Sequence, residues 1–228
     1  MYWYFDPTYL LVILGVIITA AASIRVKSTY RKFSRVLSSR GITAERAAQT
    51  ILTRAEITDV RIERISGNLT DHYSPKEKVL RLSDSVFGSA SVAAIGVAAH
   101  ECGHAIQHKV GYAPLKLRSA SVPLANIGSW ISWPLIILGL VLGFTPLADA
   151  GVYFFAFVVL FQLVTLPVEF NASRRALAIL EEGYMLEGEE LKGARKVLSA
   201  AAMTYVAALL SAVLQLLRLV LIVNNRKR

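Results

Sequence analysis

The chain has 228 residues, 54% of them hydrophobic, and a formal net charge of +9 at pH 7. Soluble domains are usually about 45–50% apolar. Because the excess here lies in uncharged blocks, the composition excludes an ordinary soluble globular protein. The single cysteine, Cys102, excludes an intramolecular disulfide and fits a reducing compartment.

The first uncharged block, residues 9–24, is close to the length that a membrane-spanning helix needs. No basic residue precedes it, which favours a retained anchor over residues 1–24 rather than a cleaved signal peptide. Basic residues follow the block at Arg25, Lys27, Arg31, Lys32, Arg35 and Arg40. This asymmetry predicts that the N-terminus lies outside and that residues 25 onward lie in the cytoplasm. The net charge therefore indicates membrane topology and contact with anionic lipids, and not binding of nucleic acid.

Residues 25–122 are long enough for a cytoplasmic catalytic unit, and their patterns predict a small α+β fold. Residues 43–52 predict a helix with Thr43 as its N-cap, and residues 60–65 alternate as a half-buried strand does. Residues 69–73 and 79–83, separated by a Ser-Pro turn, predict a β-hairpin. A further helix is expected to begin after Ser89 or Ser91 and to end near Lys109. The hairpin at residues 69–83 could offer an edge strand to an extended substrate, a hypothesis that substitutions in Val79–Ser83 would test.

Two further uncharged blocks, residues 127–144 and 151–168, predict a transmembrane hairpin within residues 123–168. Residues 169–200 are predicted to form a cytoplasmic helix. Residues 201–228 are expected to form a C-terminal membrane helix with a basic tail, although they contain Gln215 and Arg218. If this helix spans, its tail lies outside against the charge rule, so a spanning helix and a half-inserted or interfacial helix both stay open. The predicted fold is a mainly α-helical integral membrane protein with about four transmembrane helices and a small α+β unit.

The segment Val97–His108, VAAHECGHAIQH, contains three of the four histidines. On a helix His100 and His104 lie one turn apart on the same face, so both imidazoles can bind one zinc ion. Glu101 then lies beside the metal, where a general base for a zinc-bound water belongs. The small residues around the motif would let other elements approach closely. His108 is about 12 Å from His100 along the helix axis, which is too far for a shared tetrahedral ion.

The third metal ligand must come from another segment, and Glu169 is the leading candidate. It lies at the inner end of the third apolar block, where an acid is costly unless it is paired or metal-bound. The alternatives are an ion pair of Glu169 with Arg174 or Arg175, or a ligand from elsewhere, such as His72 or the acids of residues 181–190. Candidates for a second electrophile are His72, Tyr73, Asn171, Arg174 and Tyr184.

Three stretches resemble, in the same order, the YugP-type membrane zinc metallopeptidases of bacteria: residues 70–83, His100–His104 and Pro167–Ser173. The arrangement is also similar to the HtpX-like membrane proteases, in which the third-ligand stretch reads E-x-x-A-D. Here Glu169 and Ala172 match that stretch, but Ser173 stands where the aspartate would be. Ser173 can form a hydrogen bond but brings no charge. Either Asn171 or another acid then orients the ligand histidine, or metal binding is weaker.

The resemblance implies a zincin-like cytoplasmic unit with an HExxH helix in a multi-pass protein of the bacterial cell membrane. It implies a gluzincin-like endopeptidase with one Zn²⁺ per chain on His100, His104 and Glu169, and with Glu101 as the base. The expected partners are the lipid bilayer and protein or peptide substrates, with membrane proteins among the candidates. An oligomer or a membrane partner stays open. Two other functions also stay open: a scaffold or regulatory protein with a structural or vestigial zinc site, and a zinc hydrolase of non-peptide amides or esters.

Overall fold

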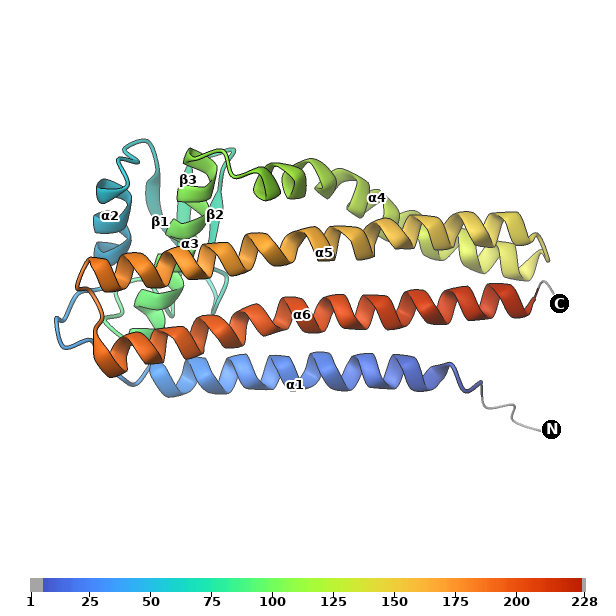
Figure 1. The fold of residues 1–228 in the computed structure, drawn as a ribbon, viewed down its shortest axis with the longest axis horizontal. Coiled ribbons are helices and arrows are strands. Elements are labelled where there is room, and N and C mark those ends of the chain that lie inside the picture. The colour runs from blue at the N-terminus through green and yellow to red at the C-terminus, as the bar shows by residue number, and fades with distance from the viewer. Residues whose placement is uncertain (1–5, 227–228) are drawn as a thin grey trace. The chain divides into compact units, whose positions relative to one another are not determined.

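The computed structural model describes residues 6–226, and most of these residues are helical. Two predictions fall on residues that the structure does not describe: the location of residues 1–5 on the outer side of the membrane, and the last two residues of the basic tail. The elements in chain order are α1 (Tyr9–Phe33), α2 (Ala44–Arg54), β1 (Arg61–Ile65), β2 (His72–Ser74), β3 (Val79–Ser83), α3 (Val92–Lys109), α4 (Ala113–Val141), α5 (Thr145–Glu182) and α6 (Gly188–Asn225) (Figure 1).

The chain divides into two compact units. The apolar unit comprises Met1–Ser23, Lys116–Leu166 and Thr204–Arg228. The motif unit comprises Ile24–Leu115 and Pro167–Met203, and it contains the sheet, α2 and α3 together with parts of α1, α5 and α6.

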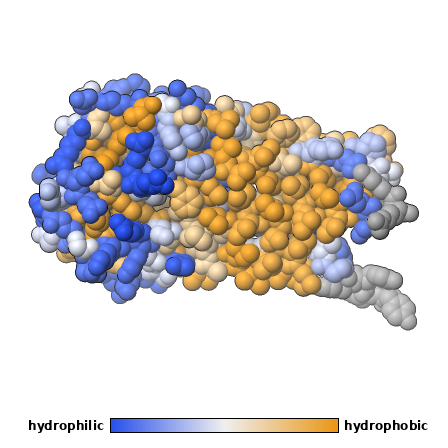
Figure 2. Space-filling view, in the orientation of Figure 1, coloured by the Kyte–Doolittle hydropathy of each residue, from blue (hydrophilic) through white to orange (hydrophobic). Residues whose placement is uncertain are grey.

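Within residues 6–226, four helices are long and apolar enough to cross a membrane: α1, α4, α5 and α6. In their most apolar windows only 6% to 28% of the residues are buried inside the protein. Figure 2 shows the hydrophobic side chains that gather on the surface of these helices. Because so much exposed apolar surface is rare in soluble monomers, this finding supports a membrane protein with about four spans, as predicted.

Arg218 lies within the fourth apolar helix, where an unpaired charge would be costly. Its guanidinium carbon lies 4.5 Å from the centre of the Tyr9 ring, a cation–π geometry. The two helices that carry these residues also meet at Gly15, where an added Cβ would lie 2.8 Å from Ser211 Oγ. The partner on α1 lowers the cost of embedding Arg218, which favours the spanning interpretation of α6.

The motif unit is built around α3, whose buried residues belong to one hydrophobic core with α2, the sheet and the adjoining parts of α5 and α6. The predicted helices, strand and hairpin are confirmed within a few residues. Ser91 is the N-cap of α3, and its Oγ accepts a hydrogen bond from Ala94 N at 3.2 Å. This residue, and not Ser89, therefore starts the motif helix.

The sheet has the order β1-β3-β2, in which β3 pairs parallel with β1 and antiparallel with β2. The hairpin therefore does contain an edge strand, β2, but Val79–Ser83, where the test of this hypothesis was placed, is not one. This segment is the central strand, and both of its sides are already hydrogen-bonded. The edges of the sheet are β1 and β2.

Residues 169–200, predicted as one cytoplasmic helix, belong to two helices. The α5 helix runs without interruption from the third apolar block to Glu182, and α6 begins at Gly188. The turn between them includes Tyr184, which has a positive φ of 53°. Glu169 is thus held by the continuation of a long helix and not by a separate one.

Candidate metal centre

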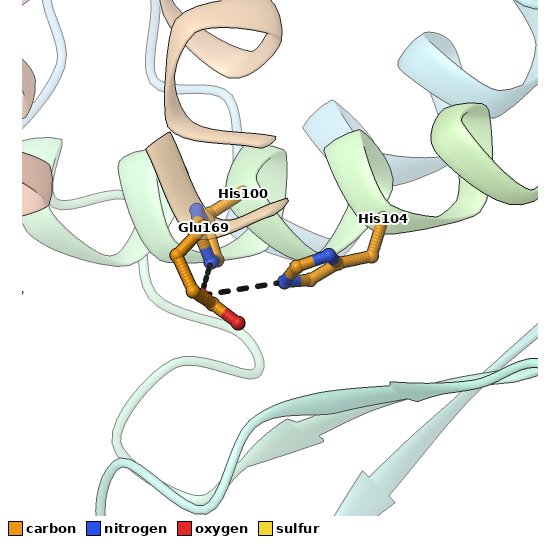
Figure 3. A group of neighbouring side chains, drawn as sticks. All are labelled: His100, His104 and Glu169. Carbon is orange, nitrogen blue, oxygen red and sulfur yellow. Dashed lines mark ion pairs between the residues drawn. The ribbon is translucent and has the colours of Figure 1, made fainter. Parts of the chain in front are cut away.

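The ligand cluster consists of His100 and His104 on α3 and Glu169 on α5, all within the motif unit (Figure 3). Glu169 Oε2 lies 3.3 Å from His100 Nε2 and 3.6 Å from His104 Nε2. The candidate ligand atoms of all three residues lie within 4.8 Å of one another. The two histidines and the distant glutamate that the sequence singled out are therefore neighbours in space.

These distances fit a zinc ion. Ligand atoms about 2.0–2.1 Å from a tetrahedral ion are about 3.3 Å apart, close to the two measured separations. The Glu169 side chain is only 2% exposed, so its carboxylate is directed into the protein and towards the two rings. Two imidazoles and one carboxylate are a ligand set that catalytic zinc sites use, with a fourth position open to water. The residues present can hold this metal.

The close approach of α3 and α5 depends on Gly103. A Cβ added at this position would lie 2.6 Å from the carbonyl oxygen of Ala172, which is one turn after Glu169. At Gly96, on the same helix, an added Cβ would lie 3.4 Å from Ala194 Cβ on α6. The expectation that small residues let other elements approach the motif helix is thus confirmed.

Each ligand imidazole is also held at its other nitrogen. His100 Nδ1 lies 3.1 Å from Ser173 Oγ, and His104 Nδ1 lies 3.1 Å from Gln107 Oε1. If Nδ1 carries the proton, it donates to these oxygens and Nε2 is free to bind a metal. The sequence left open which residue orients the ligand histidine. Ser173 is placed to orient His100, through a hydrogen bond that involves no charged group.

Gln107 is a functional candidate that the sequence analysis missed. It is fully buried, and its amide nitrogen donates to Val168 O at 2.8 Å and to Asn171 Oδ1 at 3.0 Å. Asn171, which was predicted near the site, thus contacts Gln107 and not a ligand side chain directly. The only local signal was the position of Gln107, a polar residue one turn after His104 on a helix that also carries other polar side chains.

Glu101 is 8% exposed and forms no hydrogen bond or ion pair within the described part of the chain. The negative charge of the nearby Glu101 helps to raise the pKa of Asp71. The main cause of that raised pKa is burial, which hydrogen bonds from Ser83 oppose. The charge of Glu101 is therefore felt as far as Asp71, whose carboxylate is held by Ser83.

The pKa of His104 reflects the same environment. Burial alone would lower it, but the hydrogen bond with Glu169 and the negative charges of Glu101 and Glu169 outweigh that effect. The resulting pKa lies above the ordinary value of a histidine.

Two residues on β2 that the sequence placed near the metal site form hydrogen bonds with other residues. His72 Nδ1 lies 2.9 Å from Thr70 O, and the Tyr73 hydroxyl lies 2.9 Å from His108 Nδ1. His108 itself is exposed, in agreement with its exclusion from the ligand set. The strand β2 nonetheless packs against α3, so both side chains stay candidates for contact with a substrate.

The other residues singled out by the sequence lie away from the ligand cluster or have structural contacts. Arg174 is exposed and lines a recess between α5 and α6, and Tyr184 is exposed in the turn that follows α5. Arg175 donates to Asn171 Oδ1 at 2.8 Å. Cys102 is fully buried, and its burial strongly raises the pKa of the thiol, so it serves packing rather than chemistry.

The chain matches over residues 8–224 a family model described as "Putative neutral zinc metallopeptidase". It is also 46% identical over 205 residues to the "Putative membrane protease YugP" of Bacillus subtilis (strain 168), a comparison that covers 90% of this chain and 91% of that protein. No solved structure matches the chain.

Proposed function

The chain belongs to the family described as "Putative neutral zinc metallopeptidase", and on this premise we propose that it is a membrane-embedded, zinc-dependent endopeptidase. The observation that carries the proposal is the convergence of His100, His104 and Glu169 next to a buried glutamate. That glutamate, Glu101, follows the first ligand directly in the sequence, as the general base of an H-E-x-x-H site does.

In this proposal His100, His104 and Glu169 would hold one zinc ion, which supplies Lewis-acid polarisation of a peptide carbonyl and lowers the pKa of a bound water. Ser173 and Gln107 keep the Nε2 atoms of the two imidazoles directed at the metal position. Glu101 takes the proton from the attacking water onto its carboxylate and then gives it to the leaving amine nitrogen.

The edge strand β2 is the proposed docking site for an extended substrate. It has β3 as its only strand partner in the described sheet, and it packs against the motif helix. A peptide bound to the inactive Glu101→Gln variant should slow amide hydrogen exchange in His72–Ser74. Unchanged exchange across β2 at saturating peptide would rule out this docking mode.

The catalytic assignment is tested by metal analysis and a proteolysis assay on three proteins. The wild type should contain one zinc per chain and cleave an unfolded or membrane protein substrate. Glu101→Gln should keep the zinc and lose about 10²- to 10⁴-fold in cleavage rate, the usual contribution of a general base. Glu169→Ala should lose both zinc and cleavage, because one of three protein ligands is gone.

His108→Ala is the matched control for the metal analysis, since it removes a histidine of the same helix that lies outside the ligand cluster. It should bind zinc as the wild type does. Proteolysis retained in Glu101→Gln would contradict the assignment of the base. A wild type that holds zinc without cleaving peptide bonds would favour a structural zinc site, or a hydrolase of other amides or esters.

We further propose that the protein lies in the bacterial cytoplasmic membrane with its metal centre facing the cytoplasm. The support is the basic run between Arg25 and Arg40 after the first apolar block. Because the native Cys102 is buried, a cysteine introduced at an exposed position can be labelled selectively. With an impermeant maleimide, Pro146→Cys should react in intact spheroplasts, whereas Lys76→Cys should react only after lysis. The opposite pattern would reverse the orientation.

A further inference from the structure

A basic recess of about 600 Å³ lies between α1 and α6 within the motif unit. Its cations are Arg25 and Lys32 on α1 and Arg195 and Lys196 on α6. Hydroxyl groups from Ser28, Thr29 and Ser199 line the same space. Its volume is within the range of sites that hold small ligands.

The four cations of this recess have no direct carboxylate partner among the described residues, although Lys196 lies near enough to Glu189 for its charge to help lower the pKa of that carboxyl. In the part of the chain that the structure describes, none of them forms an ion pair with a carboxylate, and no acidic side chain lines the recess. Nearby basic residues differ in this respect, since Lys192 pairs with Glu189 at 2.7 Å and Arg40 pairs with Glu187 at 2.7 Å. Arginine, lysine and hydroxyl groups together are the donors that bind phosphate.

The position of the recess along its two helices points to a lipid. Arg25 directly follows the uncharged residues 9–24 of α1, and Lys196 directly precedes the uncharged residues 197–217 of α6. On both helices the cations therefore stand where an apolar stretch of spanning length ends. This is the level at which phospholipid headgroups lie.

The walls of the recess are held by helix packing and not by mobile loops. A Cβ added at Gly193 of α6 would lie 2.8 Å from the Phe33 ring of α1, so the two helices touch closely there. A second recess of about 490 Å³ shares Arg195 and Ser199 and continues along α5 and α6. Half of its ten lining residues are apolar, among them Leu177 and Leu198, and the other half include Arg174 and Glu181. A ligand with both a phosphate and an apolar part fits this pair better than a free anion does.

We propose that the basic recess binds the phosphate headgroup of an anionic phospholipid. Arg195 can hold two phosphate oxygens in its planar fork, and the lysines contribute point charges. The hydroxyl groups of Thr29 and Ser199 complete the hydrogen bonds to the headgroup, whereas the Ser28 hydroxyl already donates to Arg25 O. The proposal concerns lipid binding and does not rest on the proposed peptidase activity.

The test uses the full-length protein purified in detergent and titrated with phosphatidylglycerol, phosphatidylcholine or inorganic phosphate. Retained lipid is counted by native mass spectrometry, and the rise in melting temperature is measured for each additive. The wild type should bind phosphatidylglycerol and show little response to the other two. Because each basic residue near an anionic headgroup is worth roughly fivefold in affinity, Arg195→Gln/Lys196→Gln should weaken phosphatidylglycerol binding about 25-fold.

The matched control is Arg31→Gln/Arg35→Gln, which removes the same charge from the same basic region outside the recess. It should change the affinity by less than about threefold. Equal losses in the two variants would overturn the proposal, because they would show attraction by net charge alone. Equal stabilisation of the wild type by inorganic phosphate would also overturn it in favour of a free anion. If the double variant does not fold, Lys196→Gln is compared with Arg31→Gln, and the expected difference is about fivefold.

Discussion

At the residue scale, the candidate metal centre depends on two hydrogen bonds that fix the imidazoles. Ser173 bonds His100 with one hydroxyl, whereas Gln107 bonds His104 and also the backbone and side chain of the neighbouring helix. Removal of Gln107 would take a buried donor away from the Val168 carbonyl and from Asn171 Oδ1, which keeps Arg175 as its second partner. Gln107 therefore couples the orientation of a ligand ring to the contact between α3 and α5.

We expect Gln107→Leu to weaken zinc binding by about 10- to 100-fold, the usual cost of removing a group that orients a ligand histidine. Ser173→Ala should have a smaller effect, because it removes one hydrogen bond, whereas Gln107→Leu removes three. Competition with a chelating dye measures the zinc dissociation constant of each variant.

Gln49→Leu, the same substitution at an exposed position of α2, is the control and should leave zinc affinity unchanged. Equal zinc affinities for Gln107→Leu and Gln49→Leu, with both proteins folded, would show that Gln107 only fills space.

Helix periodicity explains which site residues the sequence could predict. His100 and His104 share a face because they are four positions apart, and no tertiary information is needed. Ser173 is likewise four positions after Glu169 and faces the same way, whereas Arg174 is turned about 140° from Glu169. Counting helical positions from Glu169 could therefore have excluded Arg174 from the metal site. Position on the helix alone could not reveal the role of Gln107, because its partners on α5 lie 61 and 64 positions later in the chain.

At the element scale, the site exists because α3 and α5 touch at a glycine. The carbonyl of Ala172 occupies the place where a side chain at position 103 would begin. Because Ala172 and Glu169 are one turn apart, any displacement of α5 there also moves the carboxylate away from the two histidines. A shift of 1 Å is enough to spoil a ligand distance that is defined within about 0.2 Å.

Gly103→Ala should therefore lower zinc affinity by at least tenfold and destabilise the motif unit by about 1–3 kcal/mol, as overpacking does in a close-packed interior. Zinc titration and thermal unfolding measure the two effects. Gly96→Ala is the same change two turns earlier on α3, where the nearest atom is the Ala194 methyl group at 3.4 Å and not a backbone oxygen. If the two variants behave alike, the contact at Gly103 does not position Glu169.

The elements themselves were largely predictable, but their partners were not. Alternation and turn residues identified the strands at 60–65 and 69–83 because these signals are local. The parallel pairing of β1 with β3 joins segments on either side of β2, and no local pattern encodes it. The burial of Val79, Leu80 and Leu82 fits a central strand, whereas a short apolar run alone does not distinguish a central strand from an edge strand.

At the scale of the whole molecule, the candidate metal ligands are far apart in the sequence. All of α4 and the larger part of α5 lie between His104 and Glu169. The apolar blocks predicted the four candidate spans because length and lack of charge suffice for that inference. They did not predict that α5 would continue past its apolar part and carry Glu169 into the motif unit. A metal held by α3 and α5 therefore fixes a long-range contact of that unit.

Removal of zinc should accordingly lower the stability of the protein. A ligand that binds only the folded state stabilises it by about 4 kcal/mol when present at 1,000 times its dissociation constant. Treatment with a chelator should then lower the melting temperature by about 10 °C, and added zinc should restore it. In Glu169→Ala the chelator should have little effect, because the site has already lost a ligand. A wild-type melting temperature that is insensitive to the chelator after complete removal of zinc would show that α3 and α5 are held together by packing alone.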